Sequence, residues 1–418
     1  MVKVAMIVEA TTMVAAGCSF SYFEDNPAGK LKASHSGSLI SLETMGAGGR
    51  MNDSTTAKDV FKHVPVEKPS FGIGDLKKAI PPHCFKRSLT TSFYYLFRDL
   101  GLIYSFYYIA TNYITLLPQP YSYVAWPLYW IAQGSILMGL WNIVHDCGHH
   151  CFSDYQWLDD SIGFICHSLL LTPYFSFKYS HRTHHANTSS LEKDEVWVPK
   201  SKHDTWFYEV LSNPVGNLIM LSFRLLFGFP LYFMFNLHGR IYKGFPSHFN
   251  PLGPIFNDRE RAQIWLSDAG VLTVLYALYR IGAKEGLKWV FYIYGYPLMA
   301  MSAFFIMFTY LHHTHPSIAH YDSSEWDWLR GALSTVDRDY GILNNLFHDV
   351  TSAHVVHHLF SSIPHYHTVE ATQYIKPILG DYYNYDYTPI LKAIWRDTKE
   401  CLYIEEDPEK KGVYWFRK

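Results

Sequence analysis

The chain has 418 residues, of which 49% are hydrophobic and 17% are charged, against a usual charged share of about 25%. This much apolar surface excludes a disordered or fibrous chain. A formal net charge of −2 argues against a general nucleic-acid binder, which is normally basic. The six cysteines are scattered without a CxxC pair, so we expect no disulfide scaffold. Histidine is the outlier, because the chain has 23 of them and many stand in tight clusters beside apolar runs.

Residues 1–44 contain no run long enough to span a membrane. The first 18 residues are too irregular for a signal peptide. Ser and Lys are present, as in a plastid transit peptide, but the acidic residues Glu9, Glu24, Asp25 and Glu43 weaken that interpretation.

Five later stretches approach or exceed the ~20 predominantly apolar residues that cross a bilayer: 100–117, 121–144, 215–236, 262–281 and 287–311. A soluble protein with buried core helices is the alternative, but the 121–144 run carries no Asp, Glu, Lys or Arg. Lys and Arg crowd residues 77–87, 178–202 and the region after 317, which the positive-inside rule places in the cytosol. An even number of crossings must then separate residue 180 from residue 350. We expect four spans in two hairpins, with 215–236 in the membrane interface because it carries Arg224.

Three histidine clusters carry the chemistry. They have spacings that place imidazoles on one face of a helix, and they comprise His145, His149 and His150; His181, His184 and His185; and His354, His357 and His358. Nine imidazoles exceed the four ligands of one zinc ion, so they indicate two metals with five or six ligands each. Imidazole accommodates Fe, Zn, Cu and Ni, so the residues alone leave the metal open. His313 or His315, at the end of the last apolar run, could complete the coordination.

Longer strings make the sequence recognisable. They are MGAGGRM (45–51), AIPPHCFKRS (79–88), FSDYQWLDD (152–160), PYFSFKYSH (173–181), YDSSEWDW (321–328) and GALSTVDRDY (331–340). With the three clusters, they resemble the plant acyl-lipid Δ12 (omega-6, oleate) fatty acid desaturases of the endoplasmic reticulum. The likeness begins at Met45. It predicts an extension over 1–44 that is disordered or an artefact of the gene model, a cytosolic segment over 45–95 and a membrane desaturase domain over 96–418.

The resemblance implies an all-α integral membrane protein whose cytosolic helical cap holds a non-haem diiron site. It implies two iron ions, O2 as oxidant, and electrons from cytochrome b5 and NADH-cytochrome b5 reductase. The substrate would be an acyl chain on a phospholipid such as phosphatidylcholine, in the endoplasmic reticulum membrane, with the histidine clusters facing the cytosol. The chain lacks a His-Pro-Gly-Gly motif, so a separate electron donor is expected. A homo- or heterodimer is left open, as is the choice between His149 and His150 as ligand.

Some residues beside the clusters depart from the family pattern. Asp146 stands where Δ12 desaturases carry Glu, and Val144, Cys151 and the pair at 352–353 also differ. A divergent relative acting on oleoyl or linoleoyl chains, namely an acetylenase, conjugase, hydroxylase or epoxygenase, is therefore the main alternative. A His-rich metal transporter is the more remote alternative. It predicts internal repeats and polar ligands within the spans, whereas we find no internal repeat and the apolar runs contain no His before His312. A sterol- or alkane-oxidising relative does not account for the long strings. Six aspartates could orient the imidazoles: Asp146, Asp159, Asp160, Asp194, Asp337 and Asp349.

Overall fold

The computed structural model describes residues 62–202 and 210–418. The predicted extension over 1–44, and residues 45–61 of the predicted cytosolic segment, lie outside the described residues.

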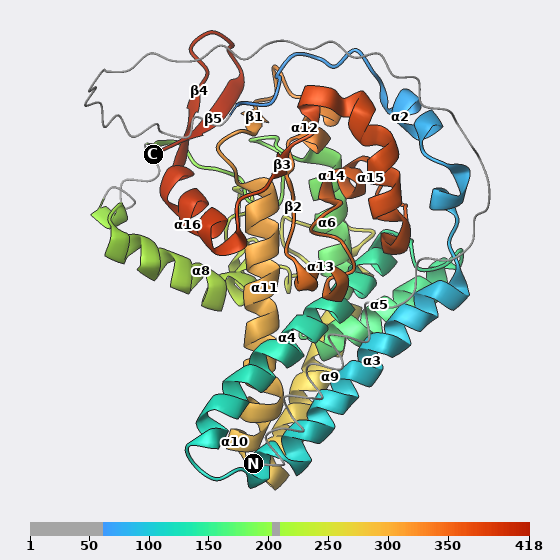
Figure 1. Ribbon diagram of the computed structural model, residues 1–418, viewed down its shortest axis with the longest axis vertical. Helices are drawn as coiled ribbons and strands as arrows, with labels where there is room; N and C mark the ends of the chain where they lie inside the picture. Colours follow the sequence, from blue (N-terminus) through green and yellow to red (C-terminus); the bar gives the residue numbers. More distant parts are fainter. Residues whose placement is uncertain (1–61, 203–209) are drawn as a thin grey trace, which may run out of the picture. The chain divides into compact units, whose positions relative to one another are not determined.

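The described chain is mostly helical (Figure 1). Long helices α3, α4, α9 and α11 run along one direction, while α8 lies across them at the level of the upper end of α11. The helices are α2 (Ile73–Ala79), α3 (Leu89–Asn112), α4 (Tyr121–Gly148), α5 (Gln156–Leu169), α6 (Tyr174–Asn187), α8 (Pro214–Phe235), α9 (Arg261–Glu285), α10 (Leu287–Val290), α11 (Tyr296–His313), α12 (Trp328–Leu333), α13 (Ile342–Leu346), α14 (His354–Leu359), α15 (His365–Leu379) and α16 (Ile390–Glu400). Single turns occur at η1 (Pro82–Phe85), η2 (Ile114–Leu116) and η5 (Gly380–Tyr382), and the π-helical turn η4 (Phe291–Gly295) joins α10 to α11.

Helix α4 packs against α3, α11 and α13, and two glycines allow its close approach to α11 and to α13. A Cβ on Gly134 would lie 2.8 Å from the Pro297 carbonyl oxygen, and one on Gly139 would lie 2.2 Å from that of Leu346. Both contacts are shorter than any real Cβ makes, so only glycine permits this packing without a backbone shift. The C-terminal half of α4, which carries His145, is therefore buried between its neighbouring helices.

Among the described residues, three helical segments are long and apolar enough to cross a membrane: Pro214–Phe235, Arg261–Glu285 and Leu287–His313. Two of them coincide with predicted spans, and the first is the helix predicted to lie in the interface. Helices α3 and α4, predicted as the first hairpin, do not meet the same measure. Tyr and Trp lower the mean hydropathy of α4, as do polar residues that serve contacts between helices. Gln133, for example, donates to the Ile103 carbonyl, and Trp130 donates to that of Tyr292.

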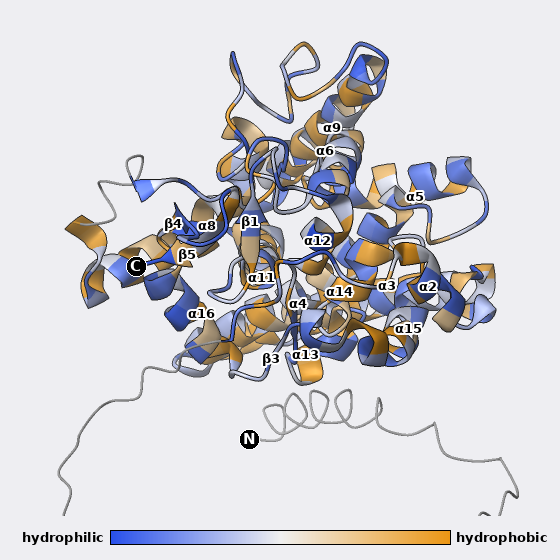
Figure 2. Ribbon diagram, turned by 90° about the horizontal axis from the view of Figure 1, so that it is seen from above, coloured by the Kyte–Doolittle hydropathy of each residue, from blue (hydrophilic) through white to orange (hydrophobic). Residues whose placement is uncertain are grey.

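Short strands and helices gather at one end of the long helices (Figure 1), and among them α16 and β4 contain many hydrophilic residues (Figure 2). The strands form a three-stranded antiparallel sheet in the order β1-β5-β4 and a parallel pair β2-β3. Arg338 is fully buried on β2 and forms ion pairs with Asp386 of β3 and with Asp397 of α16. This network ties β2, β3 and α16 together. Strand bounds are β1 (Ala319–Tyr321), β2 (Asp337–Arg338), β3 (Tyr385–Asp386), β4 (Tyr403–Glu406) and β5 (Val413–Arg417).

Candidate metal centre

The first histidine cluster lies where α4 ends. His145 and His149 are four residues apart, so both imidazoles leave the same face of the helix. The chain then reverses at His150, which has a positive φ of 57°. Because of this reversal, His150 points away from its neighbours: its Nδ1 lies 3.8 Å from an Asp159 oxygen.

The second and third clusters lie on two further helices. His181, His184 and His185 occupy the C-terminal half of α6, and His354, His357 and His358 make up half of the six-residue helix α14. Helix α14 is too short to be stable alone. Its first turn is secured by Asp337, whose carboxylate accepts a hydrogen bond from the Val355 amide at 2.8 Å.

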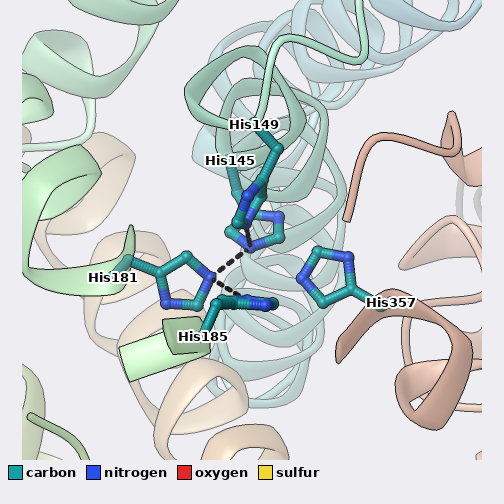
Figure 3. A group of neighbouring side chains, drawn as sticks. All are labelled: His145, His149, His181, His185 and His357. Atoms are coloured by element: carbon teal, nitrogen blue, oxygen red, sulfur yellow. Dashed lines mark hydrogen bonds between the residues drawn. The ribbon is translucent and has the colours of Figure 1, made fainter. Parts of the chain in front are cut away.

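Five of these imidazoles form the first group, which comprises His145, His149, His181, His185 and His357 (Figure 3). One nitrogen from each lies within 4.8 Å of the others. The Nε2 atoms of His145 and His181 are 2.7 Å apart, and those of His181 and His185 are 3.0 Å apart. Two nitrogens bound ~2.1 Å from one ion, at a right angle, would be ~3.0 Å apart. The spacing of the first group therefore matches that of ligands around one metal ion.

A second group lies beside the first and is built around His184, His313 and His358. His354 adjoins it, because its Nε2 lies 3.0 Å from Nε2 of His313 and 3.2 Å from that of His358. The rings of His185 and His358 stack across the boundary with centroids 4.2 Å apart. Helices α6 and α14 thus each supply imidazoles to both groups.

Burial favours the neutral form of His181, His185, His357 and His358. It lowers the pKa of His357 to about 3 and places the pKa values of His181, His185 and His358 well below their ordinary range. A neutral imidazole has a nitrogen lone pair that can bind a metal. Within the described part of the chain, Nε2 of His184 and Nε2 of His357 are buried without a hydrogen-bond partner. Each group thus contains a buried nitrogen that lacks a hydrogen-bond partner and could bind a metal, and imidazole ligands suit transition-metal ions.

One carboxylate fixes the orientation of a second-group imidazole. Asp194 lies 2.6 Å from Nδ1 of His184, and both side chains are buried. The same carboxylate accepts hydrogen bonds from the amides of Ser189 and Val196. Nδ1 of His184 is thereby held as the donor, and Nε2 is left free toward the second group.

Of the three remaining predicted ligands, one lies in the second group and two lie outside both groups. His313 belongs to the second group, whereas His315 does not, because its Nδ1 lies 2.6 Å from the Ser317 hydroxyl and its Nε2 faces Asp386. His150 also lies outside both groups. Among the other aspartates, Asp160 binds Tyr174 and Lys178 rather than an imidazole.

An apolar cavity opens beside the two groups. Five histidines from both groups line it, together with side chains from α4, α6, α8 and α11 that include Trp141, Phe177, Phe305 and Ile306. Gly228 of α8 faces Ile306, whose Cδ1 would lie 3.0 Å from an added Cβ. No sequence pattern selects these lining residues, because they come from several helices and from the loops after α6 and α8.

A family model and several known proteins are similar to this chain. The family model described as fatty acid desaturase matches residues 122–389. The chain is 60% identical over 379 residues to the Delta(12)-fatty-acid desaturase of Arabidopsis thaliana, covering 89% of this chain and 99% of the relative. It is also 60% identical to Delta(12)-fatty-acid desaturase FAD2 of Vernicia fordii, covering 90% of this chain and all of the relative. Identity is again 60% with the enzyme of Brassica juncea named omega-6 fatty acid desaturase, endoplasmic reticulum, covering 89% of this chain and 99% of the relative.

Proposed function

Because this chain belongs to the fatty acid desaturase family and is therefore an oxidoreductase, we propose that it introduces a cis double bond at the Δ12 position of oleoyl chains on membrane phospholipid. The observation that carries the proposal is the pair of buried imidazole groups beside an apolar cavity. A methylene C–H bond is unreactive toward amino-acid side chains, so a metal must supply the reactivity. The names of the relatives support the Δ12 position.

Two iron ions are the proposed cofactor. His145, His149, His181, His185 and His357 would hold one, and His184, His313, His354 and His358 the other. When bound, the iron pair and O2 supply the oxidant that removes hydrogen from the acyl chain. The protein's own part is positional: Asp194 orients His184, and the walls formed by Trp141 and Phe305 keep the chain beside the imidazoles and exclude water.

Three of the departures from the family pattern have side chains that do not line the cavity. Asp146 is the nearest to it, because its carboxylate lies 3.4 Å from Nδ1 of His145 in the first group. The Asp146 carboxylate accepts a hydrogen bond from the His365 amide, and the Cys151 thiol donates to the Ser361 carbonyl. Val144 is fully buried in the main core. The absence of these three side chains from the cavity wall supports the parent desaturation over a divergent product.

For the membrane arrangement, we propose spans at α3, α4, α9 and α10–α11, with α8 in the interface. In support, these helices lie along one direction and α8 lies across them (Figure 1). Helices α3, α4 and α9 also expose large apolar and aromatic side chains, such as Phe97, Leu128 and Leu272, which a membrane would cover. The imidazole groups then face the cytosol. A glycosylation acceptor inserted at residues 118–120 should be modified in microsomes, and one inserted after α6 should not; the opposite result overturns this arrangement.

The cytosolic side of the endoplasmic reticulum membrane is the proposed location, with cytochrome b5 and its NADH-dependent reductase as electron donors. The name of the Brassica juncea relative supports the compartment. Turnover in proteoliposomes should therefore require both added donor proteins together with NADH. Turnover that is equally fast without cytochrome b5 would exclude it as the donor.

Fatty-acid profiling tests the proposed reaction directly. Yeast expressing the chain is fed oleate, then linoleate, and methyl esters are analysed by gas chromatography with mass spectrometry. A 9,12-dienoic product from oleate is expected. An acetylenic, conjugated, hydroxylated or epoxidised product would replace the proposal with the divergent alternative.

A further inference from the structure

A separate set of potential metal ligands lies where η1 meets α15. His83 and Cys84 are consecutive residues of η1, and His367 and Glu370 are three residues apart in the first turns of α15. One ligand atom from each of the four residues lies within 4.8 Å of the others. None of these residues belongs to the two groups described above.

The contacts within the cluster converge on Glu370. One of its carboxylate oxygens lies 2.9 Å from Nε2 of His83, and the other lies 3.8 Å from Nδ1 of His367. The Cys84 side chain is fully buried, and its sulfur lies within 4.8 Å of the ligand atoms of the other three residues. The rings of His83 and His367 meet edge to face with centroids 5.5 Å apart. Two imidazoles, a thiol and a carboxylate therefore surround one point at the protein surface.

We propose that His83, Cys84, His367 and Glu370 form a separate divalent-cation site of the zinc class. Zinc binds thiolate, imidazole and carboxylate ligands, and its structural sites have four ligands. Thiolate and imidazole together favour zinc, whereas the all-imidazole groups contain no sulfur ligand. This site does not depend on the proposed desaturation chemistry.

The metal-free cluster has an electrostatic conflict that a cation removes. Burial, and then the Glu370 carboxylate, raise the pKa of the Cys84 thiol to about 11, because a thiolate there would face a like charge. A bound divalent cation reverses this effect, since it attracts both anions and deprotonates a coordinated thiol. One proton leaves the thiol as the metal binds.

The position of the site suggests what the metal would stabilise. Cys84 belongs to a hydrophobic cluster in which Leu76 and Ile80 of the N-terminal segment pack against Val356 of α14 and Ile375 of α15. Helix α14 carries His354, His357 and His358. A metal joining η1 to α15 would hold α2 and η1 against α15 and against α14, the helix that carries the third histidine cluster.

Cobalt(II) substitution tests the proposal in the full-length purified protein. Cobalt bound to a thiolate gives a near-ultraviolet charge-transfer band that all-imidazole cobalt sites lack. We expect the band to saturate at one thiolate-bound cobalt per chain and to be displaced by zinc. Cys84→Ser should abolish the band and weaken zinc binding by at least about tenfold. Its iron content should stay unchanged.

Two further variants control for misfolding and for cobalt binding to a different thiol. Cys401→Ser, which removes a buried cysteine outside the proposed site and outside both imidazole groups, should keep the band. His367→Ala leaves every thiol in place and should shift the band and lower zinc affinity. The proposal is overturned if the wild-type protein shows no thiolate band, if Cys84→Ser retains it, or if His367→Ala leaves both the band and the zinc affinity unchanged.

Discussion

Replacing Asp194 by Asn tests whether the second imidazole group needs an oriented His184. The Asp194 carboxylate accepts three hydrogen bonds, from Nδ1 of His184 and from the amides of Ser189 and Val196. Asn keeps one acceptor oxygen and replaces the other by an NH2 group that can only donate. At least one buried donor then faces another donor, which costs about 1–3 kcal/mol of stability.

The effect on metal binding is separate from the loss of stability. Without the carboxylate, His184 can place its proton on either nitrogen, and the tautomer with Nε2 protonated cannot bind a metal. Loss of such an orienting group costs ~10–100-fold in metal affinity, or ~1.4–2.7 kcal/mol. We therefore expect Asp194→Asn to bind about one iron per chain instead of two and to lose most of its desaturase activity.

The assay combines iron analysis of the purified protein with fatty-acid profiling. Asp160→Asn is the matched control, because Asp160 is a half-buried acceptor that binds Tyr174 and Lys178 instead of an imidazole. It should lose stability and keep two irons per folded chain. If Asp194→Asn retains two tightly bound irons, or if both variants lose iron equally, the assigned role of Asp194 is wrong.

Three other expectations follow from the same geometry. His184→Ala should abolish turnover and reduce bound iron, whereas His150→Ala should retain at least about half of the activity, because His150 lies outside both groups; equal loss in iron analysis and product profiling would contradict this difference. Gly139→Ala should lower the free energy of unfolding by ~1–3 kcal/mol, because its Cβ would overlap the Leu346 carbonyl; an unchanged melting temperature would show that α4 can shift. Burial lowers the pKa of His357 from 6.5 to about 3, so the unfolded chain binds more protons below pH 6.5 and the folded state loses stability as the pH falls; melting temperature and bound iron should decline together from pH 6.5 downward, and a flat profile to pH 4 would contradict this.

The sequence predicts the family and most of the candidate centre, because three local spacings place the histidines on helices. The family is confirmed by the similarity of the chain to Δ12 desaturases. Which histidines converge depends on the direction of the chain after each helix. His149 and His150 are adjacent in sequence, yet only the reversal at His150 separates them. Asp194 could be one of six candidates from the sequence, but its contact with His184 requires the loop after α6 to fold back.

Membrane crossing is harder to predict for a physical reason. A hydropathy average treats a Tyr or Trp at the interface like a polar residue, and it treats Gln133 as exposed although it binds another helix. It also cannot detect that α8 lies across its neighbours (Figure 1). The cavity beside the imidazoles was not predictable either, because its walls are assembled from segments distant in the chain.

The alternation of histidines along α6 and α14 links the loading of the two metals. His184 and His185 are consecutive residues that face different groups, and so are His357 and His358. The first ion to bind would fix imidazoles on both helices and bear the entropic cost of holding the two helices together, so the second ion would bear less of it. We therefore expect cooperative loading, in which chains with a single iron are scarce at every stage of an iron titration of the wild-type protein. Native mass spectrometry would reveal this as a population of empty and doubly loaded chains, and a binomial distribution would exclude it.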